Sequence, residues 1–401
     1  MQKRAIRSIR AVQPIDDASP FWSDPTRIHR VGQPSSARNF YLDPERRFSI
    51  VAGIDDRIEA LLKLNPYAAA VAFVTGDLTV EGDLVAAIRF FLHQKHSLAA
   101  GWCALLARLD AGLPWRWSAK DNIGFHYDRS NAFYQLFLDS RMIYSAAHFE
   151  TSETSLEDAQ SAKLDRICTD LRLQPGERFL DVGCGWGGLI IRASQKYGAI
   201  SHGCTLSDQQ FLYADSLVRK QHLEGRVAVE NSDYRDLKGS FDKIASVGMF
   251  EHVGKHHLSE YFRTTYTLLD EGGLFLNRGI VRPEGVKDGP ETLFLLRNVF
   301  PGGQLVHLAE VVRAGERAGF EVIAVENLRC HYALTCRAWV RRLQQNSERA
   351  IQLVGVKTYR TWLLYLAASA VNFEDQVIGA AQVIFAKARA GSHANKRFRH
   401  S

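Results

Sequence analysis

Three glycines at alternate positions follow a short apolar segment near the middle of the chain. Residues 178–182 have the pattern of a strand, Gly183, Gly185 and Gly187 come next, and a helix-like segment follows. Glycine lets the backbone turn sharply and lets a ligand approach closely, because it has no Cβ. In an open α/β sheet such a turn lies at the carboxyl end of a strand, where ligands bind. With Asp181 just before it, the turn favours a nucleotide-like cofactor over a tight turn without a ligand.

Strand-like and helix-like segments alternate after about residue 119. Helical patterns separate the first strands, which predicts an α/β fold with a mostly parallel sheet and helices on both faces. The last strand follows a long helical insertion at residues 332–372, and we expect it to run antiparallel at the edge of the sheet. The seven expected strands are at residues 178–182, 200–206, 227–231, 241–247, 273–280, 321–327 and 381–386.

The first part of the chain has a different pattern. We expect residues 1–118 to form a smaller α+β domain with a basic, partly irregular start, and residues 119–401 to form a second domain. Within the first domain, the patterns indicate a helix at 57–64, strand-like runs at 67–80, a helix at 83–109 and a linker at 109–117.

The composition is that of a globular protein, with 46% apolar and 23% charged residues among 401. No apolar run approaches the roughly 20 residues that a membrane-spanning helix needs. The six cysteines show no C-x-x-C spacing, so we expect neither a metal site nor a disulfide framework. These features predict a cytoplasmic protein.

Basic residues gather at the two ends of the chain, which carries a net charge of +6. Neither the first ten residues nor the segment from Lys387 onward contains an acidic residue. Solvated termini would explain this, but so would contact with an anionic membrane, worth about 1 kcal/mol per basic residue near the lipid. No nucleic-acid-binding motif is present, and we expect no nucleic-acid partner. The expected location is therefore peripheral, at the inner face of the membrane.

Polar side chains follow the ends of the next three strands. Thr205 and Gln210 come after the second strand and could reach a ribose, although Thr205 could also start a helix. Tyr234 follows the third strand at a position suited to an adenine, and Glu251 follows the fourth. No acidic residue closes the second strand, which argues against a dinucleotide.

Four stretches together resemble the cyclopropane fatty-acid synthases, which include the mycolic acid cyclopropane synthases. They are residues 126–150, 180–188, 246–254 and 331–339. Members of this family use S-adenosylmethionine (SAM) to modify double bonds in lipid acyl chains. The resemblance implies a Rossmann-like, seven-stranded SAM-dependent methyltransferase fold with helical insertions.

The resemblance also implies which residues hold the cofactor. Tyr144 and Ser145 would contact the methionine part of SAM, and the three glycines would pass beneath it. The remaining contacts would be made by Thr205 and Gln210 at the ribose and by Tyr234 and Arg235 at the adenine.

Two positions depart from the family pattern at the catalytic centre. The family binds a bicarbonate ion with a cysteine, a glutamate, a histidine and a tyrosine; Glu251 and Tyr332 match the glutamate and the tyrosine. Ala146 stands in place of the cysteine, in a Tyr-Ser-Cys-Ala pattern. Arg278 stands in place of the histidine, in a Leu-His-Thr-Ile pattern. A bicarbonate site of the usual kind is therefore in doubt.

Two outcomes follow for the reaction. Arg278 could itself hold an anion, since guanidinium binds carboxylate-like groups well, and a cyclopropane would form. Alternatively Arg278 pairs with Glu251, and the product is a methyl-branched or methylene-bearing chain. In both cases we expect Glu251, Tyr332 and Arg278 to be the catalytic residues.

The resemblance thus predicts transfer of a one-carbon unit from SAM to the double bond of an unsaturated phospholipid acyl chain. A SAM-dependent methyltransferase for a non-lipid small molecule is the main alternative, and a SAM- or lipid-binding protein without activity is another. A homodimer is a further possibility. The candidates for lining an acyl channel are Phe294, Leu295, Phe300, Trp339, Trp362, Leu364 and Tyr365.

Overall fold

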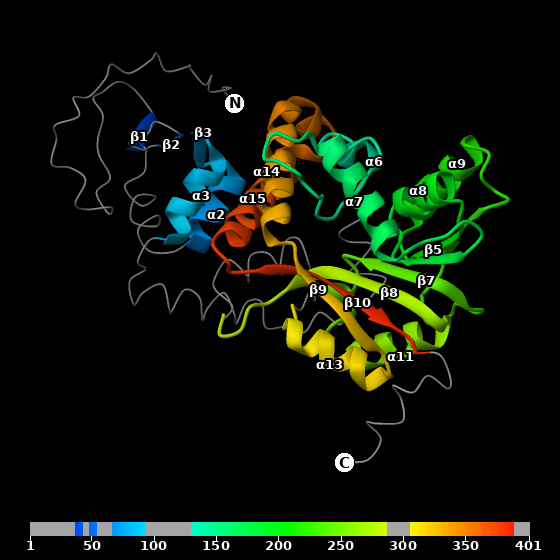
Figure 1. The fold of residues 1–401 in the computed structure, drawn as a ribbon. Helices are drawn as coiled ribbons and strands as arrows, with labels where there is room; N and C mark the ends of the chain where they lie inside the picture. The colour runs from blue at the N-terminus through cyan, green and yellow to red at the C-terminus, as the bar shows by residue number, and fades with distance from the viewer. Residues whose placement is uncertain (1–36, 43–47, 54–65, 94–129, 287–304, 389–401) are drawn as a thin grey trace.

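The computed structural model describes residues 37–42, 48–53, 66–93, 130–286 and 305–388. Within them, a seven-stranded sheet lies beside a group of helices, against which a small N-terminal unit packs (Figure 1). The boundary predicted at residue 118, the helix predicted at 57–64 and the linker at 109–117 lie outside the described residues.

The large sheet confirms the predicted α/β class. Its strand order is β6-β5-β4-β7-β8-β10-β9, and the strands from β4 to β8 are parallel. Six strands lie within two residues of their predicted bounds, while β8 begins earlier than expected. The strands are β4 (Arg178–Val182), β5 (Ile200–Thr205), β6 (Val227–Asn231), β7 (Phe241–Val247), β8 (Leu269–Val281), β9 (Glu321–Asn327) and β10 (Gly379–Ala386).

Strand β10 is antiparallel, as predicted, but it is not at the edge of the sheet. It pairs with β8 on one side and with β9 on the other, so that β9 forms the edge. The chain leaves β9, passes through two long helices and returns into the gap. Pairing between strands this far apart in sequence is not encoded in a local pattern, which is why the expected position was wrong.

Helices cover both faces of the sheet and enclose two apolar cores (Figure 1). One core lies between the sheet and α7, α8 and α9, and the other lies against α11 and α13. The helices are α7 (Leu156–Asp170), α8 (Gly188–Tyr197), α9 (Asp208–Lys220), α10 (Phe250–Val253), α11 (Leu258–Leu268) and α13 (Leu308–Ala318), with a 3₁₀ turn, η2 (Lys255–His257).

The predicted helical insertion is present as two helices, α14 (Arg329–Gln345) and α15 (Ser347–Glu374), with a kink at Gly355. With the short helix α6 (Asn131–Tyr134) they share a third core with the N-terminal unit. That unit contains β1 (Ala37–Leu42), β2 (Phe48–Gly53), α2 (Pro66–Thr75), β3 (Leu78–Gly82) and α3 (Leu84–His93).

The strand-like runs predicted at residues 67–80 are wrong for most of that segment. Helix α2 occupies it as far as Thr75, and β3 begins at Leu78. The segment is rich in alanine, which has the highest helix propensity. Gly76 ends the helix with a positive φ of 94°, and its N–H bonds to the carbonyl of Ala72 at 3.1 Å. The helix predicted at 83–109 is present as α3 within the described residues.

Candidate functional site

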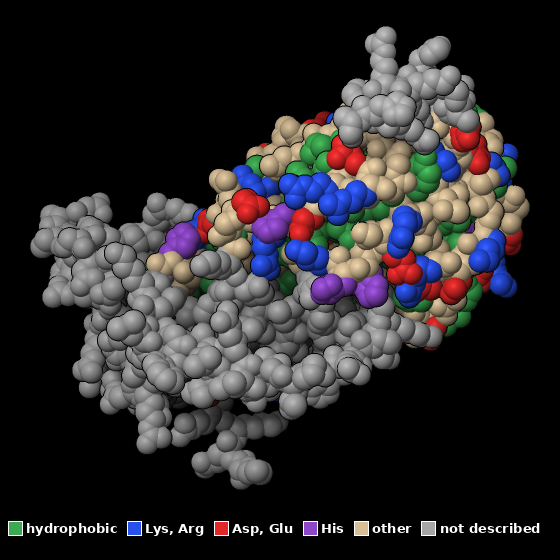
Figure 2. Space-filling model, turned by 90° about the horizontal axis from the view of Figure 1, so that it is seen from below, with side chains coloured by type: hydrophobic (Ala, Val, Ile, Leu, Met, Phe, Trp, Pro, Cys, Tyr) green, Lys and Arg blue, Asp and Glu red, His purple; other side chains and the backbone are tan. Residues whose placement is uncertain are grey.

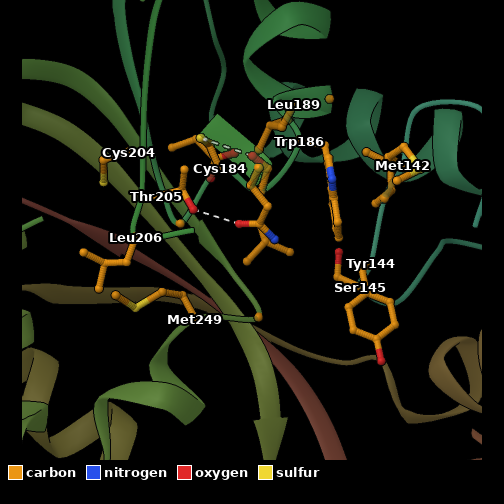
Figure 3. A pocket seen from close by; sticks show the side chains of 18 of the residues that line it. Met142, Tyr144, Ser145, Cys184, Trp186, Leu189, Cys204, Thr205, Leu206 and Met249 are labelled. Carbon is orange, nitrogen blue, oxygen red and sulfur yellow. Dashed lines mark hydrogen bonds between the residues drawn. The ribbon is translucent and has the colours of Figure 1, made fainter. Parts of the chain in front are cut away.

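A cavity opens at the carboxyl ends of β4, β5 and β7, where an open α/β sheet binds its ligands (Figure 3). Seven of the nine predicted cofactor residues line it: Tyr144, Ser145, Gly183, Gly185, Thr205, Gln210 and Tyr234. The structure thus brings together segments from three strand ends and from the loop that precedes α7.

The glycine turn forms one wall of this cavity. Gly183, Gly185 and Gly187 all have positive φ, between 54° and 85°, which favours glycine at each position. A Cβ on Gly183 would lie 2.9 Å from Cγ of Met249. Gly187 is not among the lining residues; its Cβ position is 3.1 Å from the side chain of Ala214, so it allows α8 to pack closely on α9.

Thr205 and Gln210 lie side by side at the end of β5. The Thr205 hydroxyl donates to Oε1 of Gln210 at 2.7 Å, and both side chains are buried (Figure 3). Ser207, rather than Thr205, caps α9 by accepting the N–H of Gln210. Thr205 therefore faces the cavity instead of starting the helix, which is the arrangement expected of a residue that contacts a ribose.

The two residues predicted at the adenine lie in different places. Tyr234 lines the cavity and is buried. Arg235 does not line it, since its guanidinium forms an ion pair with Asp233 at 2.7 Å and points towards Glu260, 3.9 Å away. Sequence reasoning missed other lining residues at this end, among them Cys204, Leu206, Ser232 and Met249.

Lys163 is a lining residue that sequence reasoning also missed. It is 2% exposed on α7, and its Nζ donates to Oγ of Ser145 at 2.9 Å. One turn earlier, Gln160 donates to the Ser145 carbonyl at 3.0 Å. Burial, with a smaller effect of Arg278, lowers the pKa of Lys163 to about 7. A Gln and a Lys at spacing i, i+3 on an otherwise apolar helix face were the available signal.

Glu251 lies on α10, just after the cavity-lining residue Met249. Its Oε1 accepts the backbone N–H of Ile280 at 2.6 Å, while its Oε2 is buried without a hydrogen-bond partner. Burial raises the pKa of Glu251 to about 7, and the bond from Ile280 opposes that rise. A Cβ on Gly279 would lie 2.7 Å from both carboxylate oxygens, so this glycine gives the carboxylate its space.

Arg278 is buried on β8 and does not pair with Glu251. Its Nη2 donates to the carbonyl oxygens of Ala146, at 3.2 Å, and Ala147, at 3.5 Å. Successive side chains of a strand point to opposite faces, and Glu251 packs on the Cβ side of Gly279. Arg278 and the carboxylate therefore lie on opposite faces of β8, and the ion pair considered from the sequence is wrong.

Tyr332 connects to the cofactor cavity through other aromatic rings. It stacks on Phe373, with ring centroids 4.4 Å apart, and makes an edge contact with Trp339. Trp339 in turn lies 5.0 Å from the ring of Tyr144, which lines the cavity. The three predicted catalytic residues, Glu251, Arg278 and Tyr332, are not themselves lining residues of this cavity.

The acyl-channel candidates divide into two groups. Trp339, Trp362 and Tyr365 are packed into the core that α14 and α15 share with the N-terminal unit. Leu364 packs partly buried against the same core, and Phe294, Leu295 and Phe300 lie outside the described residues.

The residues that the structure describes do not form the bicarbonate site of the family that the sequence resembles. Ala146 is 3% exposed and offers no polar side-chain atom. Arg278 faces away from Glu251, and Oε1 of Glu251 is already engaged by Ile280. No step of the reaction is therefore assigned to bicarbonate.

Residues 116–383 match the family model of mycolic acid cyclopropane synthetase. A probable fatty acid methyltransferase of Pseudomonas putida is 40% identical over 367 residues, which cover 88% of this chain and 91% of the relative. Cyclopropane mycolic acid synthase 3 of Mycobacterium tuberculosis is 35% identical, over 63% of this chain and 92% of the relative. The solved structure of the mycolic acid cyclopropane synthase CmaA1 with SAH and CTAB superposes with a TM-score of 0.64 at 33% identity, over 66% of this chain and 97% of that one.

The fold, the cavity and these similarities define a SAM-dependent methyltransferase that modifies lipids. The chain belongs to the mycolic acid cyclopropane synthetase family.

Proposed function

We propose that this enzyme transfers the methyl group of SAM to the double bond of an unsaturated phospholipid acyl chain and releases a methyl-branched fatty acyl product. Glu251 is the observation that carries the proposal. Its carboxylate is buried, its pKa is raised to about 7 by burial, and one of its oxygens has no partner. These are properties of a general base at neutral pH.

The chemistry needs little else from the protein. The alkene attacks the methyl carbon of SAM, the C–S bond breaks, and a cation forms on the acyl chain. The enzyme must align the two reactants and exclude water, which would otherwise add to the cation. The linked rings of Tyr332, Trp339 and Tyr144 supply an apolar, electron-rich surface suited to a cation. Loss of a proton to Glu251 then restores a neutral product.

The carbon that loses this proton decides the product. Loss from the new methyl group closes a cyclopropane, whereas loss from a neighbouring chain carbon leaves a methyl branch and a shifted double bond. The methyl branch is favoured because the family's cysteine and histidine are replaced by Ala146 and Arg278. The name of the Pseudomonas putida relative, a fatty acid methyltransferase, supports the same choice.

We also propose that the enzyme contacts the inner face of an anionic membrane. Figure 2 shows Lys and Arg side chains grouped on one face of the molecule, with Asp and Glu side chains among them. Lys387 is the first of the basic residues near the end of the chain. Its ammonium group donates hydrogen bonds to the carbonyls of Tyr266 and Leu269, so it is less available to bind lipid headgroups. No helix of the described residues is long and apolar enough to cross a membrane.

The test is mass spectrometry of monounsaturated phospholipid vesicles incubated with the protein and SAM. The expected result is acyl chains heavier by one CH₂ unit that lack the NMR signals of a cyclopropane ring. A ring would refute the proposed product but not the methyl transfer. Unchanged lipid, together with methylation of a small amine or hydroxyl compound, would overturn the proposal in favour of a non-lipid acceptor.

A further inference from the structure

A buried amide lies on the same face of β8 as the carboxylate of Glu251. Asn277 is 1% exposed and precedes Gly279 by two residues on β8, so both positions point to the same face of the sheet. Both differ from the Leu-His-Thr-Ile pattern of the resembling family, which has leucine and threonine at these positions. This chain therefore has a polar group where the pattern is apolar, next to the space that the carboxylate occupies.

Tyr261 holds this amide in one orientation. Its hydroxyl, on α11, donates to Oδ1 of Asn277 at 2.8 Å, and the tyrosine is fully buried. A phenol has a single proton to donate, so the carbonyl end of the amide is turned towards α11. Nδ2 of Asn277 is buried and has no hydrogen-bond partner among the described residues. Because an unpaired buried donor is costly, this NH₂ group calls for an acceptor.

The complementary atom on this face is Oε2 of Glu251, which is also buried without a partner. Side chains two residues apart on one strand face start roughly 7 Å apart, and the carboxylate oxygens lie 2.7 Å from the Cβ position of Gly279. Burial raises the pKa of Tyr261, and the charge of Glu251 adds to that rise, which places the carboxylate near the Tyr261–Asn277 pair. The two groups are thus close neighbours that no direct hydrogen bond joins, a separation that a water molecule bridges.

We propose that Asn277 is a positioning residue for Glu251, and that its NH₂ group, held by Tyr261, binds Oε2 through one ordered water molecule. A carboxylate oxygen has two lone pairs, so Oε2 keeps one for a proton from the substrate. The bridge favours the ionised carboxylate, which is the form that acts as a base. The inference rests on the proposed function only where it calls Glu251 the base, since the hydrogen bonds do not depend on the substrate.

Other charged groups around Glu251 leave the effect of this bridge measurable. Helix α10 packs against α11 and β8. On α11, Glu260 faces Arg235, 3.9 Å away, and on β8, Arg278 lies on the opposite face. His252, the next residue of α10, is neutral near pH 7, because burial lowers its pKa to about 4. Burial raises the pKa of Glu251 to about 7, and backbone hydrogen bonds oppose the rise, so loss of a further hydrogen bond should raise this pKa again.

The decisive measurement is the pKa of Glu251 in the full-length protein. NMR of protein with ¹³C at Cδ of its glutamates would follow the carboxyl group, and Glu251→Gln would assign its signal. Asn277→Leu has a side chain of similar size without the donor, and it should raise this pKa by about 0.5–1 pH unit. The pH at which kcat reaches half its plateau should rise equally, while the plateau itself and the affinity for S-adenosylhomocysteine stay at the wild-type level.

Two further variants separate positioning from a general loss of stability. Tyr261→Phe should raise the pKa of Glu251 by a smaller amount, because the amide is present but no longer held; it also serves should the Leu variant fail to fold. Thr265→Val is the matched control. It removes a buried hydroxyl one turn later on α11, which donates to the carbonyls of Tyr261 and Phe262, and it should leave the pKa unchanged.

An unchanged or lower pKa of Glu251 in both Asn277→Leu and Tyr261→Phe would overturn the proposal. A rise in the NMR titration that the kcat profile does not follow would support the bridge and show that Glu251 is not the base. The failure of the proposed function is therefore distinguishable from the failure of this inference.

Discussion

Beyond the end of β7, the carboxylate of Glu251 accepts a backbone hydrogen bond from β8 that a neighbouring strand would otherwise accept. Strands β7 and β8 pair as far as Val247 and Arg278, so the N–H of Ile280 lies beyond the ladder on that side. Glu251 accepts this N–H at 2.6 Å. The bond fixes one carboxylate oxygen and leaves the other, buried and unpartnered, free to accept a proton.

Activity should therefore depend on pH through Glu251. Burial raises the pKa of this carboxyl group to about 7, and only the ionised form is a base. The value of kcat at saturating SAM should rise about tenfold per pH unit below pH 7 and level off above it. Glu251→Gln should lower kcat by about 10²- to 10⁴-fold and should abolish this dependence. An unchanged profile in the Gln variant would show that another group takes the proton.

Turnover should not require bicarbonate. Wild-type protein in buffers freed of carbon dioxide should methylate lipid at the same rate with and without added bicarbonate, because Ala146 and Arg278 do not form the family's site. The double variant Ala146→Cys, Arg278→His carries the family's cysteine and histidine, but residue 278 still faces away from Glu251, so this variant too should show no bicarbonate-dependent rate. A wild-type rate that falls without bicarbonate and recovers on its addition would contradict this prediction.

Gly279 should be required for the position of Glu251. In Gly279→Ala the new Cβ would lie 2.7 Å from the carboxylate oxygens and 2.5 Å from Cε1 of Phe250, so both must move. We expect a loss of stability of about 1–3 kcal/mol and a clear fall in kcat, with S-adenosylhomocysteine binding retained. Gly225→Ala is the control, since nothing lies within 4 Å of its Cβ position. Full activity of Gly279→Ala would show that the carboxylate need not lie there.

Arg360 should hold the N-terminal unit against α15. Its Nη1 donates to the carbonyls of Phe73, at 2.8 Å, and Leu78, at 3.2 Å. Arg360→Met should lower the free energy of unfolding by about 1.5–3 kcal/mol, because charged hydrogen bonds to a helix end are lost. Thermal unfolding would detect this change. Lys357→Met, at an exposed position of α15, should behave as wild type, and equal stability of the two variants would refute the prediction.

The strands of the large sheet were predictable because their signals are local. The short apolar runs of β4 and β7 are each bounded by polar or glycine turns, and the structure keeps those bounds. Helix α2 was missed because a run of alanine and valine fits a buried strand as well as a helix. The packing of α2 against α15 decides between them, and that contact joins segments hundreds of residues apart in the sequence.

The residues of the site likewise divide into those that could be predicted from the sequence and those that could not. Gly183 and Gly185 follow β4, and Thr205 and Gln210 lie at and just after the end of β5, so their place in the cavity could be inferred. Lys163 is on a helix ahead of the sheet, and nothing in its own segment shows that it reaches Ser145. The space beside Gly279 for the carboxylate of Glu251 depends on two elements coming together, which a linear pattern does not reveal.

The position of β10 has a consequence for the order of assembly. Until residues 379–386 are synthesised, β8 and β9 have no common neighbour, and each presents an unpaired edge. Such edges readily pair with other chains. A nascent chain that has completed its glycine turn and its first five parallel strands is therefore still exposed to misassembly, until this late strand pairs with the free edge of β8 and with one edge of β9.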